Sequence, residues 1–420
     1  MEKLAFLFTG QGSQYVGMGK SLYNQNEIVR KTFEEANEVL GYNLNEICFE
    51  GTLSQLTKPE VIQPALLTLN VANYRVYMEQ VGIAPHFLAG HSFGEYAALV
   101  CAGAISFSDC LRLVKYRGEL TKLILETNDG AMTIIDGLPV DVLKEECKKL
   151  SNEDQFVMIN SLNSPSQFGI AGHQDIVEEF EGIMLEKGAQ ITPLLGNAPL
   201  HTPLMQGIVD KFSTFIDSIQ FYSFRVPVIS NVTAKPYGTI ENIKDLLINQ
   251  LIKPVRWIET MEFLKRYGVT HAIEMGPQNI LGNLVSANTP SIVALCYSVK
   301  DDQKTINNLF PSNHHLRRHI PTVVTRCLAI AVATPNLNYD EEEYRKGVIE
   351  PYREIQNLQE LIESENRQPT IDEMRKALNL LQTVFDTKKV SIEEQNEWKH
   401  HILHETGTYY LLKEKQVQTK

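Results

Sequence analysis

The chain opens with short apolar runs that alternate with longer segments in which apolar side chains recur every three or four positions. Leu4–Phe8 is typical of a buried strand, and residues 81–89 form a second apolar run. Between and after these runs, the 3.6-residue period predicts helices over residues 29–40, 63–80 and 108–126. Such alternation of strand and helix predicts an α/β core with a mostly parallel sheet.

The pattern changes between residues 131 and 195. Apolar alternation predicts short strands there, and amphipathic periodicity predicts two helices. The expected elements are a strand at 131–135, a helix at 139–150, strands at 156–160 and 167–171, a helix at 176–187 and a strand at 189–194. The order β-α-β-β-α-β is that of the ferredoxin-like split unit. We expect an inserted subdomain, after which the core resumes with strands at 226–230 and 270–274 and a helix around Trp257.

Beyond residue 300 the sequence becomes polar, charged and helix-favouring. Two S/T-x-x-E capping boxes, at Thr370 and Ser391, predict helix starts. Behind the first, apolar residues share one helical face: Ile371, Met374, Leu378, Leu381 and Phe385. A helical extension is our prediction, with a partly disordered tail or the remnant of a neighbouring domain as the alternative. The expected organisation is an α/β-hydrolase-like core over 1–127 and 196–300, a ferredoxin-like subdomain over 128–195 and the extension over 301–420.

Composition narrows the class of protein. The 420 residues carry a net charge of −12, which argues against a nucleic-acid-binding protein. The six cysteines are scattered, without a C-x-x-C pair or a cluster at metal-ligand spacing, so we expect free thiols in a reducing compartment and no metal. Because no apolar run approaches the ~20 residues of a membrane span, we expect a soluble, cytoplasmic protein that does not act at a membrane.

The run Gly90-His91-Ser92-Phe93-Gly94 carries the clearest chemical signal. It follows an apolar run and precedes the helix-forming residues 95–100. A serine between two glycines at a strand-to-helix turn is typical of a nucleophile, because the glycines let the turn close and the helix start offers backbone N–H groups. The pattern G-x-S-x-G also occurs in purely structural turns, so the serine needs a partner. The earlier loop Gly10-Gln11-Gly12 lacks the glycine spacing of a dinucleotide-binding fingerprint.

A serine nucleophile needs a base. His91 is adjacent to Ser92, but consecutive side chains diverge at a turn, so we expect it to point elsewhere. His201, in a loop flanked by Pro199 and Pro203, is the better candidate, although many loop histidines are only structural or exposed.

Together these segments resemble the malonyl-CoA:acyl carrier protein transacylase family, which includes the acyltransferases that serve polyketide synthases. Seven motifs in the family's order carry the resemblance over roughly residues 1–300. They are Phe8-Thr9-Gly10-Gln11-Gly12-Ser13-Gln14, Gln63-Pro64-Ala65-Leu66, Gly90-His91-Ser92-Phe93-Gly94-Glu95, Arg117-Gly118, Asn163-Ser164-Pro165, His201-Thr202-Pro203-Leu204-Met205 and Glu274-Met275-Gly276-Pro277.

The resemblance implies a role for each matching position. Ser92 would attack an acyl-CoA thioester, with His201 as general base and then acid, in a dyad without a carboxylate. The backbone N–H groups of Gln11 and Phe93 would form the oxyanion hole. The remaining implied roles are orientation of His201 by a group near Gln250, binding of an acyl carboxylate by Arg117, a pocket position for Gln63 and a place at the subdomain's edge for Asn163. Without the resemblance, Arg117 would be read as a helix-surface arginine.

The residues around the expected pocket favour malonyl over methylmalonyl groups. In the family, an aromatic residue before the histidine is common in malonyl-selective members and a small polar one in methylmalonyl-selective members, whereas this chain has Leu200. Phe93 stands where methylmalonyl enzymes often carry glutamine, which favours malonyl. Thr121 replaces the methionine common after the Arg-Gly pair. Since a hydrophobic wall rejects one methyl group by only ~1–3 kcal/mol, we expect incomplete discrimination.

The expected activity is ping-pong transfer of malonyl from malonyl-CoA to the phosphopantetheine thiol of an acyl carrier protein, with no cofactor. An acidic carrier protein would need a local basic patch, for which the candidates are Lys235, Lys253, Arg256, Lys265 and Arg266. We expect a free-standing monomer that acts either in fatty acid synthesis or in trans on a polyketide synthase, and the extension favours the second. The alternatives are a hydrolase that clears stalled acyl groups from carrier proteins and a binding module that recruits a synthase through the C-terminal helices.

Overall fold

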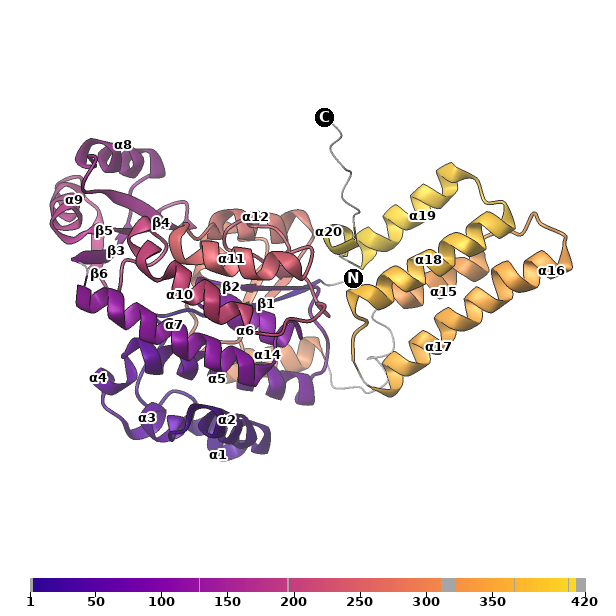
Figure 1. Ribbon diagram of the computed structural model, residues 1–420, viewed down its shortest axis with the longest axis horizontal. Coiled ribbons are helices and arrows are strands. Elements are labelled where there is room, and N and C mark those ends of the chain that lie inside the picture. The colour runs from indigo at the N-terminus through magenta and orange to yellow at the C-terminus, as the bar shows by residue number, and fades with distance from the viewer. Residues whose placement is uncertain are drawn as a thin grey trace. The chain divides into compact units, whose positions relative to one another are not determined.

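The computed structural model describes residues 3–127, 129–194, 196–310, 322–365, 367–406 and 408–412. The chain divides into two compact units (Figure 1). The larger unit comprises Met1–Tyr222 and Val228–Pro311, and the helical unit comprises Ser223–Pro227 and Ser312–Lys420. The domain boundaries expected at residues 127, 195 and 300 stay predictions.

The larger unit is built on a five-stranded parallel sheet in the order β7-β2-β1-β8-β9. The strands are β1 (Leu4–Phe8), β2 (Phe87–Gly90), β7 (Val228–Ile229), β8 (His271–Glu274) and β9 (Val293–Cys296). All residues of β1, β2 and β8 are buried, as expected where helices cover both faces of a parallel sheet (Figure 1). The helices of this part are α1 (Lys20–Gln25), α2 (Glu27–Leu40), α3 (Leu44–Glu50), α4 (Leu53–Leu56), α5 (Pro59–Gln80), α6 (Gly94–Cys101), α7 (Phe107–Thr127), the 3-10 turn η1 (Pro203–Met205), α10 (Gln206–Asp217), α11 (Glu241–Ile252), α12 (Trp257–Arg266), α13 (Leu281–Asn288) and α14 (Lys300–Leu309).

A second, antiparallel sheet has the order β4-β5-β3-β6. Its elements run along the chain as β3 (Gly130–Asp136), α8 (Val140–Leu150), β4 (Val157–Ser164), β5 (Gln167–His173), α9 (Gln174–Glu186) and β6 (Gln190–Pro193). The order of elements and the pairing confirm the ferredoxin-like subdomain. It has its own apolar core, and hydrogen bonds between β4 and Val255 tie it to the rest of the larger unit: Leu162 N–H to Val255 O at 2.9 Å and Val255 N–H to Asn160 O at 3.0 Å.

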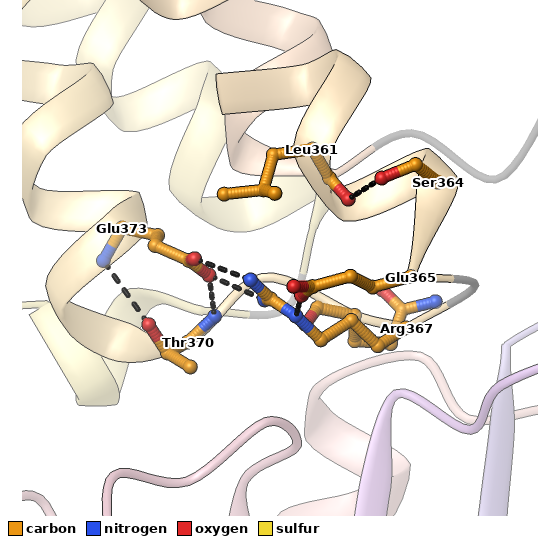
Figure 2. Close-up of polar contacts among 7 residues, drawn as sticks. Leu361, Ser364, Glu365, Arg367, Thr370 and Glu373 are labelled. Atoms are coloured by element: carbon orange, nitrogen blue, oxygen red, sulfur yellow. Dashed lines mark hydrogen bonds and ion pairs between the residues drawn. The ribbon is translucent and has the colours of Figure 1, made fainter. Parts of the chain in front are cut away.

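The helical unit confirms the helical C-terminal part of the predicted fold. Its elements are α15 (Val323–Ala333), α16 (Glu341–Tyr344), the π-helical turn η3 (Arg345–Ile349), α17 (Glu350–Ser364), α18 (Ile371–Lys388), α19 (Ile392–Glu405) and α20 (Tyr409–Leu412). The apolar face predicted for α18 packs into a core with α15 and α17. Thr370 forms a complete capping box with Glu373, whereas at Ser391 only the serine side chain caps its helix. Arg367 pairs with Glu373 and Glu365 at the turn that leads into α18 (Figure 2).

Some predicted boundaries were wrong, for local reasons. The apolar run at residues 81–89 becomes a strand only at Phe87, because Val81 ends α5, Gly82 adopts a left-handed φ of 72° and Pro85 follows. The strand predicted at 226–230 shortens to β7. Strand β9 was missed, since its four residues carry no distinctive period. Among the described residues, no helix is long and apolar enough to cross a membrane.

Candidate active site

Ser92 lies on a sharp turn between β2 and α6. Its φ is 51°, a left-handed conformation that is uncommon for a residue with a side chain. The two glycines of the motif allow this turn sterically. A Cβ on Gly90 would lie 1.9 Å from the carbonyl carbon of Gly94, and one on Gly94 would lie 2.0 Å from the carbonyl oxygen of Phe8. The turn is therefore packed directly against its own helix and the end of β1, as a nucleophile elbow requires.

His201 meets Ser92 across 109 residues of sequence. Its Nε2 lies 2.5 Å from Ser92 Oγ, and its Nδ1 lies 2.6 Å from the main-chain oxygen of Gln250. Because a carbonyl oxygen only accepts, Nδ1 must carry the hydrogen, which leaves Nε2 of the neutral ring free to accept from the serine hydroxyl. His201 also has a left-handed φ of 63°.

The protonation state of His201 suits a base. Burial lowers the pKa of His201 to about 3, and the charges of Arg117 and His91 act in the same direction, while the hydrogen bond to Gln250 opposes them. The imidazole is therefore neutral at physiological pH.

Two backbone contacts fix the loop that carries His201. Its own N–H donates to the Leu251 oxygen at 2.9 Å, and the amide of Asn160 donates to the oxygen of Leu200 at 2.8 Å. Leu200 is buried directly beside the histidine. Asn160 comes from β4, so the ferredoxin-like subdomain helps to hold the base in place.

A buried carboxylate connects the serine turn to the group that orients the histidine. Glu95 Oε2 accepts hydrogen bonds from the side-chain amide of Gln250 at 2.6 Å and from the Asn231 N–H at 3.2 Å, and Tyr237 donates to Oε1. The Asn231 side chain accepts from the Ser92 N–H at 2.6 Å and donates to the Gly90 oxygen at 2.6 Å. The Gln250 side-chain amide also donates to the main-chain carbonyl oxygen of Ser92 at 3.0 Å.

Sequence reasoning missed Glu95 and Asn231 as parts of the site. Glu95 did leave a signal in the sequence, since it is a carboxylate at the start of an otherwise apolar helix, and the structure shows that it is fully buried. Burial raises the pKa of Glu95 to about 7, against the hydrogen bonds that stabilise its charged form. Asn231, 139 residues away from Ser92, left no signal in the pattern.

The loop after β1 lies against the serine turn. A Cβ on Gly10 would be 2.6 Å from the His91 oxygen and 3.5 Å from the Phe93 nitrogen. The side chain of Asn70 anchors this loop, because its amide donates to the Thr9 oxygen at 3.0 Å and its oxygen accepts from the Thr9 hydroxyl at 3.3 Å. Within the described parts of the chain, neither the Gln11 nor the Phe93 backbone N–H donates to a protein atom. Both are therefore available to a ligand oxygen.

Arg117 is fully buried on α7, and none of its three side-chain nitrogens has a hydrogen-bond partner among the residues that the structure describes. The guanidinium carbon lies 5.5 Å from the ring centre of Tyr96 and 6.0 Å from that of Phe93. The side-chain amide of Gln63 is likewise fully buried without a partner. A buried guanidinium without an anion is costly, so the site is suited to a negatively charged ligand group.

His91 points away from the serine hydroxyl. Its Nε2 lies 2.8 Å from Asn163 Oδ1 and 3.3 Å from the Ser161 hydroxyl, and its ring packs edge-on against Trp257 with centroids 5.2 Å apart. Asn163 lies on β4 and contacts His91, not Ser92 or His201. No group of three or more His, Cys, Asp or Glu side chains that could hold a metal occurs in the described part of the chain.

The sequence model of the family described as "acyl transferase domain" matches residues 5–289. The chain belongs to this acyl transferase family. The match covers the serine turn, the histidine loop, Gln250 and the buried Arg117, so this acyltransferase has its candidate site within the family domain. The fold agrees with the assignment, as the structural relatives show.

Solved and curated relatives carry transacylase names. The acyltransferase is 35% identical over 395 residues to a malonyl CoA-acyl carrier protein transacylase from Bacillus subtilis, covering 94% of this chain and 99% of the relative, so that alignment extends into the helical unit. A protein of the same name from Escherichia coli K12 is 40% identical over 295 residues, 70% of this chain and 95% of the relative. The transacylase structure from Coxiella burnetii has a TM-score of 0.71 at 35% identity, covering 74% of this chain and 98% of that one. A malonyl-transacylase in complex with its type II PKS acyl-carrier protein has a TM-score of 0.71 at 37% identity, covering 73% and 100%.

Proposed function

We propose that this acyltransferase moves a malonyl group from malonyl-CoA, through an ester on Ser92, to the phosphopantetheine thiol of an acyl carrier protein. The observation that carries the proposal is the buried, unpartnered guanidinium of Arg117 beside Phe93, the residue after the serine. Its fork of N–H donors matches the free carboxylate of a malonyl group. The malonyl-transacylase names of the relatives support the same substrate.

The proposed first half-reaction forms the acyl-enzyme. Ser92 Oγ attacks the thioester carbonyl while its proton passes to His201 Nε2, and the carbonyl oxygen becomes an oxyanion that accepts from the Gln11 and Phe93 N–H groups. Collapse of the tetrahedral intermediate breaks the carbon–sulfur bond, and His201 returns the proton to the departing CoA thiolate. No metal or other cofactor takes part in these steps.

The second half-reaction runs the same steps in reverse. The carrier protein's phosphopantetheine thiol gives its proton to His201 and attacks the Ser92 ester, and Ser92 leaves with the proton restored. Throughout, the Gln250 carbonyl holds the ring of His201, and Arg117 with Gln63 holds the acyl chain in the pocket.

We propose malonyl rather than methylmalonyl as the preferred group. Leu200 is buried beside His201, and Thr121 uses its hydroxyl to donate to the Arg117 oxygen at 2.7 Å, so that hydroxyl already has a protein partner. The preference rests on Phe93, which stands where methylmalonyl enzymes often carry glutamine and whose ring centre lies 6.0 Å from the Arg117 guanidinium carbon. An apolar wall discriminates against one methyl group only through the space that it leaves.

A basic surface is proposed to receive the carrier protein. Of the five candidates, Arg256 is engaged by Glu259 through two hydrogen bonds, so its charge is neutralised locally. Lys235, Lys253, Lys265 and Arg266 are exposed and are the better docking residues.

A role in trans on a polyketide assembly line is supported by the structural relative that binds a type II PKS carrier protein.

Intact-mass measurement after incubation with malonyl-CoA tests the proposal. The wild-type chain should gain one malonyl group, and Ser92→Ala should gain none. Ser286→Ala is the matched control, since that hydroxyl only donates to Gly282 O within α13. Arg117→Lys keeps the charge but loses the fork, and its malonyl loading should fall by about 30-fold or more. If the protein releases free acid from acyl carrier protein and takes nothing from malonyl-CoA, the hydrolase alternative holds instead.

A further inference from the structure

The hydroxyl of Tyr96 is an unused polar group beside the candidate site. Tyr96 lies four residues after Ser92, in the first turn of α6, and its side chain is fully buried. In the described part of the chain its hydroxyl proton has no acceptor, and the polar group near it is the Arg117 guanidinium, which can only donate. Buried hydroxyl groups are normally paired, so an unpaired one beside a buried guanidinium that also lacks an acceptor points to a ligand.

The surroundings of this hydroxyl indicate the charge of that ligand. The Tyr96 ring stacks on Phe93, with centroids 5.6 Å apart, and the Arg117 guanidinium carbon lies 5.5 Å from the Tyr96 ring centre. The Tyr96 hydroxyl, the Arg117 guanidinium and the Gln63 amide are all buried, and none of them has an acceptor among the residues that the structure describes. A guanidinium, an amide and a phenol that lack acceptors are satisfied together by one anion with several acceptor positions.

We infer that the Tyr96 hydroxyl donates a hydrogen bond to the free carboxylate of the acyl group, beside Arg117, and thereby selects dicarboxylic over monocarboxylic acyl groups. This inference rests on the proposed malonyl transfer. Two carboxylate oxygens offer about four acceptor positions, of which a bidentate arginine uses two. The tyrosine is a donor at neutral pH because burial raises its pKa, against the opposing effects of the charge and hydrogen bonding of Arg117.

Because the Tyr96 hydroxyl and the Arg117 guanidinium need an acceptor from the ligand, they distinguish acyl groups with a free carboxylate from those without one. An acetyl group has no carboxylate, so it would enter the pocket and leave both Tyr96 and Arg117 without an acceptor. Sites built to hydrogen-bond a substrate group reject analogues that lack it far more strongly than apolar walls do. Tyr96 is thus a specificity-determining residue, separate from the serine and histidine that carry the bond-making steps.

Tyr96→Phe, compared with Tyr77→Phe, tests the inference. Tyr77 also has a buried hydroxyl without a partner, but it lies on α5 and packs against Phe6, with centroids 4.7 Å apart, and against Tyr297. The rate of Ser92 acylation is measured by intact mass over a range of malonyl-CoA and acetyl-CoA concentrations, and thermal unfolding of each variant is measured without substrate.

Tyr96→Phe should lower kcat/KM for malonyl-CoA by about 10-fold or more, the effect of losing a hydrogen bond to a charged group, and should change acetyl-CoA loading by less than about twofold. Tyr77→Phe should change neither. Both variants should unfold at or above the wild-type temperature, because neither loses a protein hydrogen bond.

An equal fall with both substrates would overturn the inference, since it would indicate that Tyr96 positions the serine turn. Unchanged malonyl loading would overturn it as well. The proposed function would instead be refuted if the wild-type chain failed to take malonyl, or if Arg117→Lys left malonyl loading unchanged.

Discussion

The Nδ1 atom of His201 lies 2.6 Å from the main-chain carbonyl oxygen of Gln250. A carbonyl does not titrate, so it holds the neutral imidazole in one tautomer without adding a negative charge. A carboxylate in this place would raise the pKa of the histidine, whereas here burial dominates and lowers it. The pairing thus gives an oriented base that stays neutral.

The pH dependence of acylation should reflect this neutral base. With the pKa of His201 lowered to about 3, protonation of the histidine should not slow Ser92 acylation between pH 8 and about pH 5. Rapid-quench intact-mass measurement of the malonyl adduct checks the profile. Glu95, with its pKa raised to about 7, titrates in the same range, so the profile is also recorded for Glu95→Gln. An inflection near the ordinary histidine pKa of about 6.5 that persists in this variant would contradict the assignment.

The lowered pKa of His201 should also reduce the free energy of unfolding of the protein in mild acid. The unfolded chain binds a proton at His201 below about pH 6.5, while the folded protein does not until the pH approaches 3. The free energy of unfolding contributed by this residue therefore falls as the pH drops through that window. Denaturant titrations of the wild type and His201→Phe, which has no titrating ring, should diverge progressively below pH 6.5.

Glu95→Gln should impair catalysis through position, without contact with substrate. The two carboxylate oxygens of Glu95 together accept hydrogen bonds from Gln250, Asn231 and Tyr237. A glutamine side chain has only one accepting oxygen, and its NH₂ group donates, so at least one of these bonds is lost. We expect kcat to fall by about 10-fold with KM nearly unchanged, as for a misplaced dyad. Steady-state kinetics with malonyl-CoA measure this split.

Glu274→Gln is the matched control for Glu95→Gln. Glu274 is also buried, with its pKa raised to about 7, but it accepts from the N–H groups of Ile280 and Gly282 at the start of α13. For both glutamates the folded protein holds an extra proton between about pH 4.5 and 7, so their contribution to stability is lost as the pH rises through 7. Both variants should flatten that loss, but only Glu95→Gln should lower kcat. A fall in kcat for both would remove the case for a specific role of Glu95.

Gly94→Ala should destabilise the larger unit severely. The new Cβ would lie 2.0 Å from the Phe8 oxygen, in rigid backbone, so the elbow or the end of β1 must shift. We expect a loss of about 4 kcal/mol or more, or failure to fold, because shifting either segment of rigid backbone disrupts its packing. Chemical denaturation followed by circular dichroism measures the loss.

Gly182→Ala provides the comparison for Gly94→Ala. Gly182 lies inside α9 with nothing within 4 Å of the new Cβ. There, alanine should stabilise the helix by about 0.5–1 kcal/mol, because an unfolded chain with alanine at this position has less conformational entropy to lose on folding than one with glycine. If the two substitutions had similar effects, close packing at the elbow would not explain the need for glycine.

Glu373→Gln should weaken the helical unit by about 1 kcal/mol at pH 7. Glu373 forms two hydrogen bonds with Arg367, at 2.7 and 2.6 Å, and closes the Thr370 capping box (Figure 2). Glutamine keeps the cap but loses the ion pair. Arg367 is the main cause of the lowered pKa of Glu373, so the stabilisation is present above about pH 4.5 and is lost as the pH falls further.

Lys376→Ala is the control for this ion pair. Lys376 faces Glu354 at 3.5 Å, but both side chains are more than half exposed, so its loss should be nearly neutral. Hydrogen exchange of residues 370–374 in the full chain measures both variants. Equal protection in wild type and Glu373→Gln at pH 7 would show that the Arg367 pair contributes nothing.

The sequence by itself determined what depends on neighbours along the chain. Apolar period predicted the α/β core, the β-α-β-β-α-β order and the buried face of α18, because burial on one side of an element leaves a local repeat. The sequence also predicted the strand-to-helix turn at Ser92, since that turn itself requires glycine at positions 90 and 94. The motifs in family order then supplied roles for Ser92, His201, Arg117 and Gln11.

Only the tertiary structure decided how these residues meet. The Ser92–His201 contact spans 109 residues, and the Ser92–Asn231 contact spans 139. Hydrogen bonds of this kind depend on strand order and loop anchoring, which no local period records. For the same reason the sequence could not show the partners of Glu95, although a carboxylate in an otherwise apolar helix is unusual, and it could not distinguish Tyr96 from a core aromatic residue. Their burial and their partners, or the lack of them, exist only once β2, α6, α7 and α11 are packed together.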